Sequence, residues 1–541
     1  MLNGLMMDYQ LTLQHNFERA ITLFSKKEIV TKVGPSMHRY TYADWGRRVQ
    51  KLANALKKLG VGRGDRVGTL AWNNYRHYEC YFALTCSGAV LHTLNLRLPP
   101  EQLAYIINHA EDKVIFVDNS LVPLLDKLKD HLKTVKQYVI MGDAPQHSLP
   151  NALSYEDLIA GESDSFDWPA LKENEAAAMC YTSGTTGNPK GALYSHRALF
   201  LHSIGESMAS SVAISERDVI LAVVPMFHVQ AWGLPFSAAL NGSTLVLPGP
   251  HLQPADLLGL IQSEKVTLAG GVPTLWLGML ALLEKEKYDL SSLRTMLVGG
   301  SAAPRSMMET YEKKYGVPIT HAWGMTEMSP LGTIANLKSH MLDWPEEKRF
   351  DVRVKQGVPS ACVEIRAVDE AGKVLPWDGQ TMGELEVRGP WIISSYYKLE
   401  GSTDRFHDGW FRTGDVVTID PEGYINITDR TKDLVKSGGE WISSIDLENA
   451  LMAHPKILEA AVIALPHPKW QERPLALVVE KPDFKGKVTK DELYDSIRNK
   501  FNKMWLPDDI VFIDVVPKTS VGKFDKKVLR EQFKAYQLPT M

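Results

Sequence analysis

The sequence predicts an α/β protein in which a large region of alternating helices and strands precedes a β-rich region and a small α+β region. Three observations predict this fold. Amphipathic helices alternate with short apolar strands as far as residue 300, turn-rich strands begin near residue 358, and a new helix with further strands follows a charged stretch at residues 429–434. Helix–strand alternation at this spacing is typical of helical layers on a mainly parallel sheet.

The first helix and strand illustrate the pattern. Thr41 can cap a helix that ends near Gly60, and a strand follows at residues 66–71. The apolar stripe of this helix has helical spacing and consists of Trp45, Val49, Leu52, Leu56 and Leu59. We expect further helices at residues 100–109, 121–131 and 255–265, and strands or similar units at 114–118, 138–141, 219–225, 243–247 and 297–300.

The β-rich region predicts antiparallel structure, either a small barrel or a distorted sheet. Its strands are expected at residues 361–367, 383–388, 415–420 and 423–428, separated by Asp-Gly and Glu-Gly turns. The last region should contain a helix at 444–452, strands at 460–464 and 475–480, and a helix with Leu493, Ile497 and Phe501 on one face after the Thr489 capping box. We therefore predict domains at 1–428 and 435–541, joined by a hinge linker at 429–434.

Composition narrows the class of protein. The chain has 541 residues, of which 44% are hydrophobic and 23% charged, enough material for several large cores. A net charge of -4 argues against a nucleic-acid partner. The cysteines have no metal-ligand spacing, and we expect them to be small buried hydrophobes of a reducing compartment: Cys80, Cys86, Cys180 and Cys362.

The expected location is cytoplasmic. The first thirteen residues lack the basic and apolar regions of a signal peptide, and no run of 18 apolar residues predicts a transmembrane helix. Loose attachment to a membrane surface stays open.

A phosphate-binding loop is the most informative motif. Residues 181–191 hold three glycines, four Ser or Thr hydroxyls and Lys190. Free backbone N–H groups, hydroxyl donors and a cation suit a nucleotide triphosphate. The spacing differs from a Walker loop, because Lys190 follows Pro189 and Gly191 takes the place of the magnesium-binding Ser or Thr. A plain surface turn is the alternative.

Several other motifs follow in a set order: residues 225–228, 299–304, 323–327, 410–415, 436–441 and 517–523. Together with the loop and the linker they resemble the adenylate-forming superfamily of acyl-CoA synthetases, luciferases and peptide-synthetase adenylation domains. The resemblance spans residues 41–529, and Trp441 and Trp232 make it most similar to medium- and long-chain fatty-acyl-CoA synthetases. It implies two α/β lobes and a β-barrel-like subdomain, followed by a small mobile lid.

The resemblance also implies the chemistry and its cofactors. A carboxylate attacks the α-phosphate of ATP, which yields an acyl-adenylate and pyrophosphate, and the thiol of coenzyme A then displaces AMP. Donors and cations that are already in place stabilise the charge that develops in the first step. Mg²⁺ is the expected metal, and a homodimer is compatible with the family.

By resemblance, Thr182 and Lys190 would hold the β- and γ-phosphates, while Thr182 and Glu327 would share the Mg²⁺. Trp323 would close the adenine slot by stacking, although it could be a core residue, and Glu327 could be a capping glutamate. The expected ATP contacts are Thr182, Ser183, Gly184, Thr185, Thr186, Gly187, Lys190, Gly300, Ser301, Ala302, Trp323, Gly324, Met325, Thr326, Glu327, Asp415, Arg430 and Lys523.

The ribose, the hinge and the catalytic lysine are assigned in the same way. Asp415 would accept both ribose hydroxyls, and Arg430 would contact the ribose or a phosphate, although each could belong to an ordinary polar turn. Lys523 would bridge the substrate carboxylate and the α-phosphate, whereas a lysine in such a tail is otherwise a solvated surface group. The lid would rotate at Lys432 between the two half-reactions.

The acyl and coenzyme A contacts complete the expected site. We count His228 as catalytic, together with Lys523, Glu327 and Thr182. His228 would also line the acyl channel with Trp232, which is the expected gate. His228 and Trp232 could instead be core residues. Gln230 stands where Asn is usual in relatives. The lid contacts near coenzyme A would be Ser437, Gly438, Gly439, Glu440 and Trp441, of which Trp441 could be a lid-core residue.

Three rivals remain at this point. The acid could be aryl or branched, or the acyl group could pass to an amine or a carrier protein. A nonenzymatic sensor of nucleotide or acyl-adenylate is the rival from another class, and exchange of labelled pyrophosphate into ATP separates it from a ligase.

Overall fold

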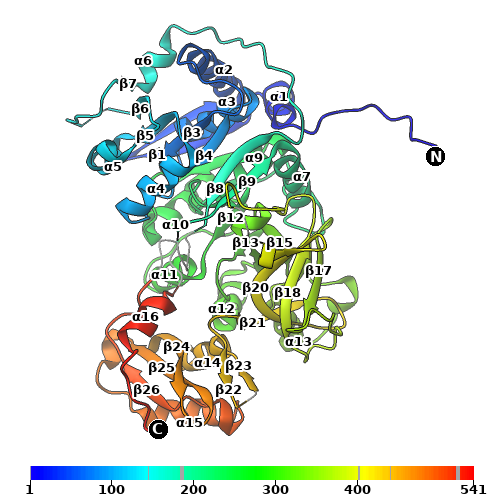
Figure 1. Cartoon of the computed structure of the whole chain (residues 1–541), viewed down its shortest axis with the longest axis vertical. Coiled ribbons are helices and arrows are strands. Elements are labelled where there is room, and N and C mark those ends of the chain that lie inside the picture. The colour runs from blue at the N-terminus through cyan, green and yellow to red at the C-terminus, as the bar shows by residue number, and fades with distance from the viewer. Residues whose placement is uncertain are drawn as a thin grey trace.

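The computed structural model describes residues 2–143, 145–182, 188–399, 403–438, 440–518 and 524–540. It confirms the predicted α/β class. Two large sheets form the amino-terminal region, a smaller antiparallel sheet follows, and an α+β domain lies at the other end of the long axis (Figure 1). In this part of the chain no helix is long and apolar enough to cross a bilayer.

The first large sheet has seven strands in the order β7-β6-β5-β3-β4-β8-β9, parallel except for the β8–β9 pair. Its strands are β3 (Arg66–Leu70), β4 (Val90–Thr93), β5 (Val114–Asp118), β6 (Gln137–Met141), β7 (Ala152–Ser154), β8 (Ala176–Tyr181) and β9 (Gly191–Ser195). Helices α4 (Pro100–Ala110) and α5 (Val122–Leu128) pack on one face. The expected helix at 121–131 is shorter, because 3₁₀ turns occupy both of its ends.

The second sheet has nine strands in the order β16-β15-β14-β13-β12-β10-β11-β1-β2. They are β1 (Glu28–Val33), β2 (Ser36–Thr41), β10 (Val219–Ala222), β11 (Thr244–Leu247), β12 (Leu268–Gly271), β13 (Thr295–Val298), β14 (Ile319–Gly324), β15 (Leu331–Ile334) and β16 (Val358–Pro359). One face packs on α10 (Pro254–Glu264), α11 (Pro273–Leu283) and α12 (Arg305–Tyr315).

The largest hydrophobic core lies between the two sheets. It contains helices α1 (Leu13–Leu23), α2 (Tyr42–Lys58), α3 (Tyr75–Cys86), α7 (His196–Ser207) and α9 (Leu234–Asn241). Helix α2 begins where the capping signal predicts, because Thr41 and Asp44 exchange side-chain and backbone hydrogen bonds. Its residues Trp45, Val49 and Leu52 are fully buried, as the helical stripe predicts.

The β-rich region is an antiparallel sheet. Its strands are β17 (Glu364–Val368), β18 (Gly383–Arg388), β19 (Phe406–His407), β20 (Trp410–Ile419) and β21 (Ile425–Arg430). Cys362 lies just before this sheet and is exposed, so the expectation of four buried cysteines is wrong. It lies in a turn before β17 rather than in the strand that the sequence predicted from residue 361, and the other three cysteines are buried.

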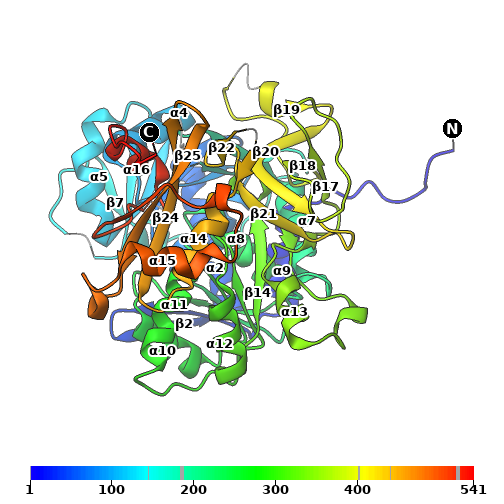
Figure 2. The same cartoon turned by 90° about the horizontal axis from the view of Figure 1, so that it is seen from below.

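The carboxyl-terminal domain has its own sheet and helices. The strands are β22 (Val435–Ser437), β23 (Glu440–Ile442), β24 (Ile457–His467), β25 (Gln471–Glu480) and β26 (Asp509–Phe512), and the helices are α14 (Ser444–Met452), α15 (Lys490–Arg498) and α16 (Lys526–Gln532). Helix α15 ends before Phe501, which the sequence placed on it; the chain turns at Lys500, and Phe501 stacks on Trp505 instead. Figure 2 shows this domain in front of the molecule, beside the β17–β21 sheet.

Candidate active site

Two of the expected ATP-binding segments meet at one edge of the nine-stranded sheet. Strands β13 and β14 are parallel neighbours with Val298 opposite His321, so the residues that follow them, Gly300 to Ala302 and Trp323 to Glu327, lie at the same end. Gly324 has no room for a side chain, because a Cβ atom there would lie 2.1 Å from the Pro330 carbonyl oxygen. The backbone can therefore pass closely at this edge.

The ends of the expected phosphate loop are held together by the β8–β9 hairpin. Tyr181 pairs with Gly191 in the ladder. The Thr182 N–H donates to the Lys190 carbonyl oxygen (2.9 Å), and the Lys190 N–H donates to the Thr182 hydroxyl (3.3 Å). Ser183, Gly184, Thr185, Thr186 and Gly187 lie outside the described residues. The hairpin thus sets Thr182 and Lys190 side by side.

Tyr396 joins this hairpin to Glu327. Its hydroxyl donates to Glu327 Oε1 (2.6 Å), and the Lys190 ammonium lies 5.0 Å from the centre of its ring. Glu327 is only 7% exposed, and the carbonyl oxygen of the preceding Thr326 accepts from Tyr194 (2.6 Å). Sequence reasoning missed Tyr396, for which a tyrosine doublet at residues 396–397 was the one available signal.

The donor set fits a magnesium ion that binds together with a nucleotide. Glu327 and Thr182 offer carboxylate and hydroxyl oxygens, which Mg²⁺ prefers. The described residues contain no cluster of three or more His, Cys, Asp or Glu that could hold a metal alone. Such a sparse set suits Mg²⁺, because this ion usually takes one or two carboxylates and fills its shell with water and phosphate oxygens.

A second cluster centres on Asp415, a buried residue of β20 with 2% exposure. Its Oδ2 accepts from the Trp323 indole N–H (2.9 Å), and its Oδ1 lies 2.5 Å from Nε of Arg430, its cross-strand partner on β21. The negative charge of Asp415 raises the pKa of Arg430. The structure therefore brings together three residues that the sequence offered from three separate motifs.

His228 precedes an unusual left-handed turn that carries Trp232. The turn, α8 (Val229–Trp232), has φ values of 43°, 52°, 52° and 60° at its four residues. Left-handed backbone costs about 1–2 kcal/mol per residue for side chains other than glycine. Gly233 continues the turn at φ 81°, and a Cβ atom there would lie 2.6 Å from His202.

Strain of this kind tends to persist where the surrounding structure holds a functional group in place. Gln230 adds to the cost, because its buried side-chain nitrogen has no hydrogen-bond partner among the described residues.

The turn places the Trp232 indole on a floor of glycines. A Cβ atom on Gly299 would lie 3.2 Å from the Trp232 ring, and one on Gly270 would lie 3.6 Å from it. Gly270 is the next-to-last residue of β12 and Gly299 follows β13, so the indole lies at the same sheet edge as Gly300 to Ala302. A side chain at Gly299 would press on this ring, whereas a Cβ atom at Gly270 would make an ordinary contact with it.

The expected hinge and lid residues follow Arg430 in the chain and have contacts of their own. Lys432 is exposed. The Ser437 hydroxyl accepts from Arg473 (3.0 Å), and the Gly438 N–H donates to the Trp470 carbonyl oxygen (2.9 Å). Trp441 borders a hollow of about 520 Å³ with Asp369, Glu370, Ala371 and Met382. Gly439, Lys523 and the side chain of Glu440 lie outside the described residues.

Comparison with known proteins places this site in context. Residues 17–397 match the family described as AMP-binding enzyme, and residues 446–523 match the AMP-binding enzyme C-terminal domain. A long-chain-fatty-acid–CoA ligase of Thermus thermophilus is 49% identical over 98% of this chain and 97% of its own. A 3-methylmercaptopropionyl-CoA ligase of Ruegeria lacuscaerulensis is 45% identical, covering 98% and 99%.

Among solved structures, an anthranilate CoA ligase in complex with anthranoyl-AMP superposes with a TM-score of 0.87. It is 26% identical, and the match covers 98% of each chain.

Proposed function

Because the chain belongs to the AMP-binding enzyme family and is an ATP-dependent acid–thiol ligase, we propose that its acid is a medium- or long-chain fatty acid. In the first half-reaction a carboxylate oxygen bonds to the α-phosphorus of ATP and pyrophosphate leaves. In the second, the coenzyme A sulfur bonds to the acyl carbon and AMP leaves.

The residues of the two clusters divide this work. Thr182 and Lys190 bind the β- and γ-phosphates, and Lys190 offsets their charge. Glu327, oriented by Tyr396, and Thr182 would hold Mg²⁺, which acts as a Lewis acid on the phosphates. Asp415, oriented by Trp323 and Arg430, accepts the ribose hydroxyls. Lys523 bridges the carboxylate and the α-phosphate.

The observation that carries the fatty-acid proposal is a cavity beside strand β13, the strand that leads to Gly299 and Trp232. The cavity measures about 480 Å³, within the range of small-molecule sites. Leu297 and Thr295 line it, and on strand β13 they share one face with Gly299, which supports the Trp232 ring. Leu297 of the cavity lining therefore lies only two positions before the glycine that contacts the ring.

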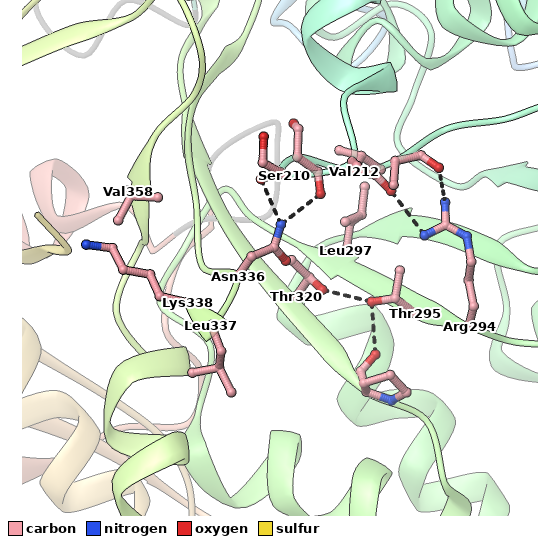
Figure 3. Close-up of a pocket in the computed structure, with 14 residues that line it drawn as sticks. Ser210, Val212, Arg294, Thr295, Leu297, Thr320, Asn336, Leu337, Lys338 and Val358 are labelled. Atoms are coloured by element: carbon pink, nitrogen blue, oxygen red, sulfur yellow. Dashed lines mark hydrogen bonds between the residues drawn. The ribbon is translucent and has the colours of Figure 1, made fainter. Parts of the chain in front are cut away.

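Figure 3 shows how the cavity is built at the start of the strands. Leu297 points between Thr320 of β14 and the loop at residues 209–213, and Asn336 and Lys338 border the other side. From Gly299 to Thr295 the strand runs about 13 Å, at about 3.3 Å per residue. An acyl chain that displaces Trp232 would follow this face of the strand away from the adenylate.

Other acids and acceptors are tested by the same assay. The Ruegeria relative carries the name of a short sulfur-containing acid, so 3-methylmercaptopropionate belongs in the panel beside aryl and branched acids. If the acyl acceptor is an amine or a carrier protein, adding coenzyme A to the assay should not increase AMP release. A cytoplasmic location, a homodimer and contact with a membrane surface stay predictions of the sequence.

The experiment measures acid-dependent exchange of labelled pyrophosphate into ATP, and then acyl-CoA formation, for acids from acetate to palmitate. We expect kcat/KM to rise with chain length into the medium or long range. A maximum at acetate, 3-methylmercaptopropionate or an aryl acid contradicts the proposed substrate class, and absence of exchange with every acid contradicts the whole reaction.

A further inference from the structure

A buried polar contact crosses the linker between the large region and the carboxyl-terminal domain. Asp429 lies on β21, where it pairs with Val416 of β20, and is therefore part of the large region's sheet. Its Oδ2 accepts from the backbone N–H of Ser444 (2.6 Å) and from the Ser444 hydroxyl (2.5 Å), at the first residue of α14. The Ser443 hydroxyl also donates to the Thr428 carbonyl oxygen.

A lysine of the last helix completes this contact. The Lys526 ammonium donates to the Ser444 hydroxyl (2.5 Å) and lies 2.6 Å from Glu448 Oε1. The side chains of Lys526 and Glu448 are 10% and 7% exposed, and Asp429 is 1% exposed. A charge so deeply buried is stable only while its partners stay in place. Lys526 follows Lys523 by three residues in the sequence.

One helical turn along α16, Arg530 makes a different kind of contact. Its guanidinium lies 2.6 Å from Asp433, which follows Lys432 in the linker. If the domain turns about residues 431–432, Asp433 moves with it and keeps Arg530. Asp429 stays on its strand, so the Asp429–Ser444 contact must break.

We propose that Asp429 is a positioning residue whose carboxylate, through Ser444 and Lys526, holds the carboxyl-terminal domain in the orientation seen here. The Arg530–Asp433 pair keeps α16 on the linker in every orientation. Loss of the Asp429 contact would release the domain to other orientations. The consequence for turnover rests on the proposed pair of half-reactions, because one orientation can serve only the half-reaction whose groups it brings to the substrate.

The direct test is a distance measurement between spin labels on the full-length protein. One label goes on Cys362, the exposed native cysteine, and the other on the cysteine introduced by Asp491→Cys, at an exposed position of α15. We expect Asp429→Ala and Ser444→Ala to shift or broaden the distance distribution relative to the labelled parent. Ser444→Ala keeps the Lys526–Glu448 ion pair, so it serves if Asp429→Ala does not fold.

The two half-reactions provide the second readout, by pyrophosphate exchange and by thioester formation from supplied acyl-adenylate. We expect their ratio to change about tenfold in Asp429→Ala, because a hydrogen bond to a charged group contributes at least that factor to an equilibrium. Lys526→Met should change the ratio of the two half-reactions as Asp429→Ala does, whereas Lys526→Arg should keep the ratio of the parent protein. The control Lys456→Met, which removes a lid ion pair with Glu492 away from the linker, should leave it unchanged.

An unchanged distance distribution in both variants, or equal loss of both half-reactions, would overturn the assignment. If the parent protein performs neither half-reaction, the proposed function fails. The distance measurement still decides whether Asp429 holds the domain.

Discussion

At the scale of single residues, the candidate site depends on side chains that orient other side chains. Tyr396 holds Glu327 and lies against Lys190, while Trp323 and Arg430 fix the two oxygens of Asp415. Carboxylates held in this way are ready for a cation or a ribose without rearrangement, which is how electrostatic stabilisation becomes effective. The functional groups and their supports are therefore separable by mutation.

Tyr396→Phe tests this separation. The variant keeps the ring beside Lys190 but loses the hydrogen bond to Glu327, so we expect kcat/KM for MgATP to fall about tenfold, the effect of one hydrogen bond to a charged group. Steady-state kinetics with varied Mg²⁺ measures the change. Tyr397→Phe, at the neighbouring position, is the matched control, and equal effects in both variants would contradict the role given to Tyr396.

A buried carboxyl group on α7 makes stability depend on pH. Burial raises the pKa of Glu206 to about 8 from an ordinary value of 4.5, whereas burial lowers the pKa of its neighbour His202 to about 3. Between pH 4.5 and 8 the folded protein keeps a proton on Glu206 that the unfolded chain releases. The stability from this group is complete below pH 4.5 and is lost as the pH rises to 8.

Glu206→Gln should remove this part of the pH dependence. Urea unfolding from pH 5 to 8 should show a shallower loss of stability than in the parent, by up to about 1.4 kcal/mol per pH unit. Glu531→Gln, at an exposed position of α16, is the control and should follow the parent. Identical profiles for Glu206→Gln and the parent would refute the shifted pKa.

At the scale of elements, strand β13 runs from the cavity to the glycines of the proposed adenylate site. Residues on one face of a strand recur at every second position, so Thr295, Leu297 and Gly299 form a single path. The left-handed turn at residues 229–232 holds Trp232 across the end of this path. Chain-length preference should therefore respond to the size of the side chain at Leu297.

Leu297→Trp should shorten the preferred acid. The indole would fill the start of the cavity, and we expect kcat/KM for palmitate to fall at least about tenfold while that for butyrate changes little. Thermal unfolding checks the overpacking, which costs about 1–3 kcal/mol. Two controls, Leu297→Ala and Met296→Leu on the opposite face, should not shorten the preferred acyl chain. An equal loss of kcat/KM for all acids in Leu297→Trp would argue against an acyl path here.

At the scale of the whole molecule, the carboxyl-terminal region forms an α+β unit with its own cores. The sequence predicts that a linker at residues 429–434 joins this unit to the rest. Such a unit can change orientation between steps while each part stays folded. Lys523 is expected to act in only one of these orientations, which makes the two half-reactions differ in their need for it.

Lys523→Ala should reduce acid-dependent pyrophosphate exchange by about 10²–10³, the cost of one preorganised charge-stabilising group. Thioester formation from supplied acyl-adenylate should be spared. Lys527→Ala, four residues further along, is the matched control, because it removes one lysine charge as Lys523→Ala does. Equal loss in both half-reactions would exclude the role of Lys523.

The sequence by itself determined the elements and the chemistry. Caps such as Thr41 and the apolar periods of helices and strands act over a few residues, so they predicted β18 and α14 at their observed bounds and α2 from its first residue. The matched family agrees with the motifs. Only the tertiary structure decided which side chains meet. Tyr396 with Glu327, Trp323 with Asp415 and Trp232 with Gly299 are pairs far apart in the chain. Sheet order and the packing of layers, rather than local spacing, determine which distant residues meet. No local sequence pattern therefore predicted these pairs.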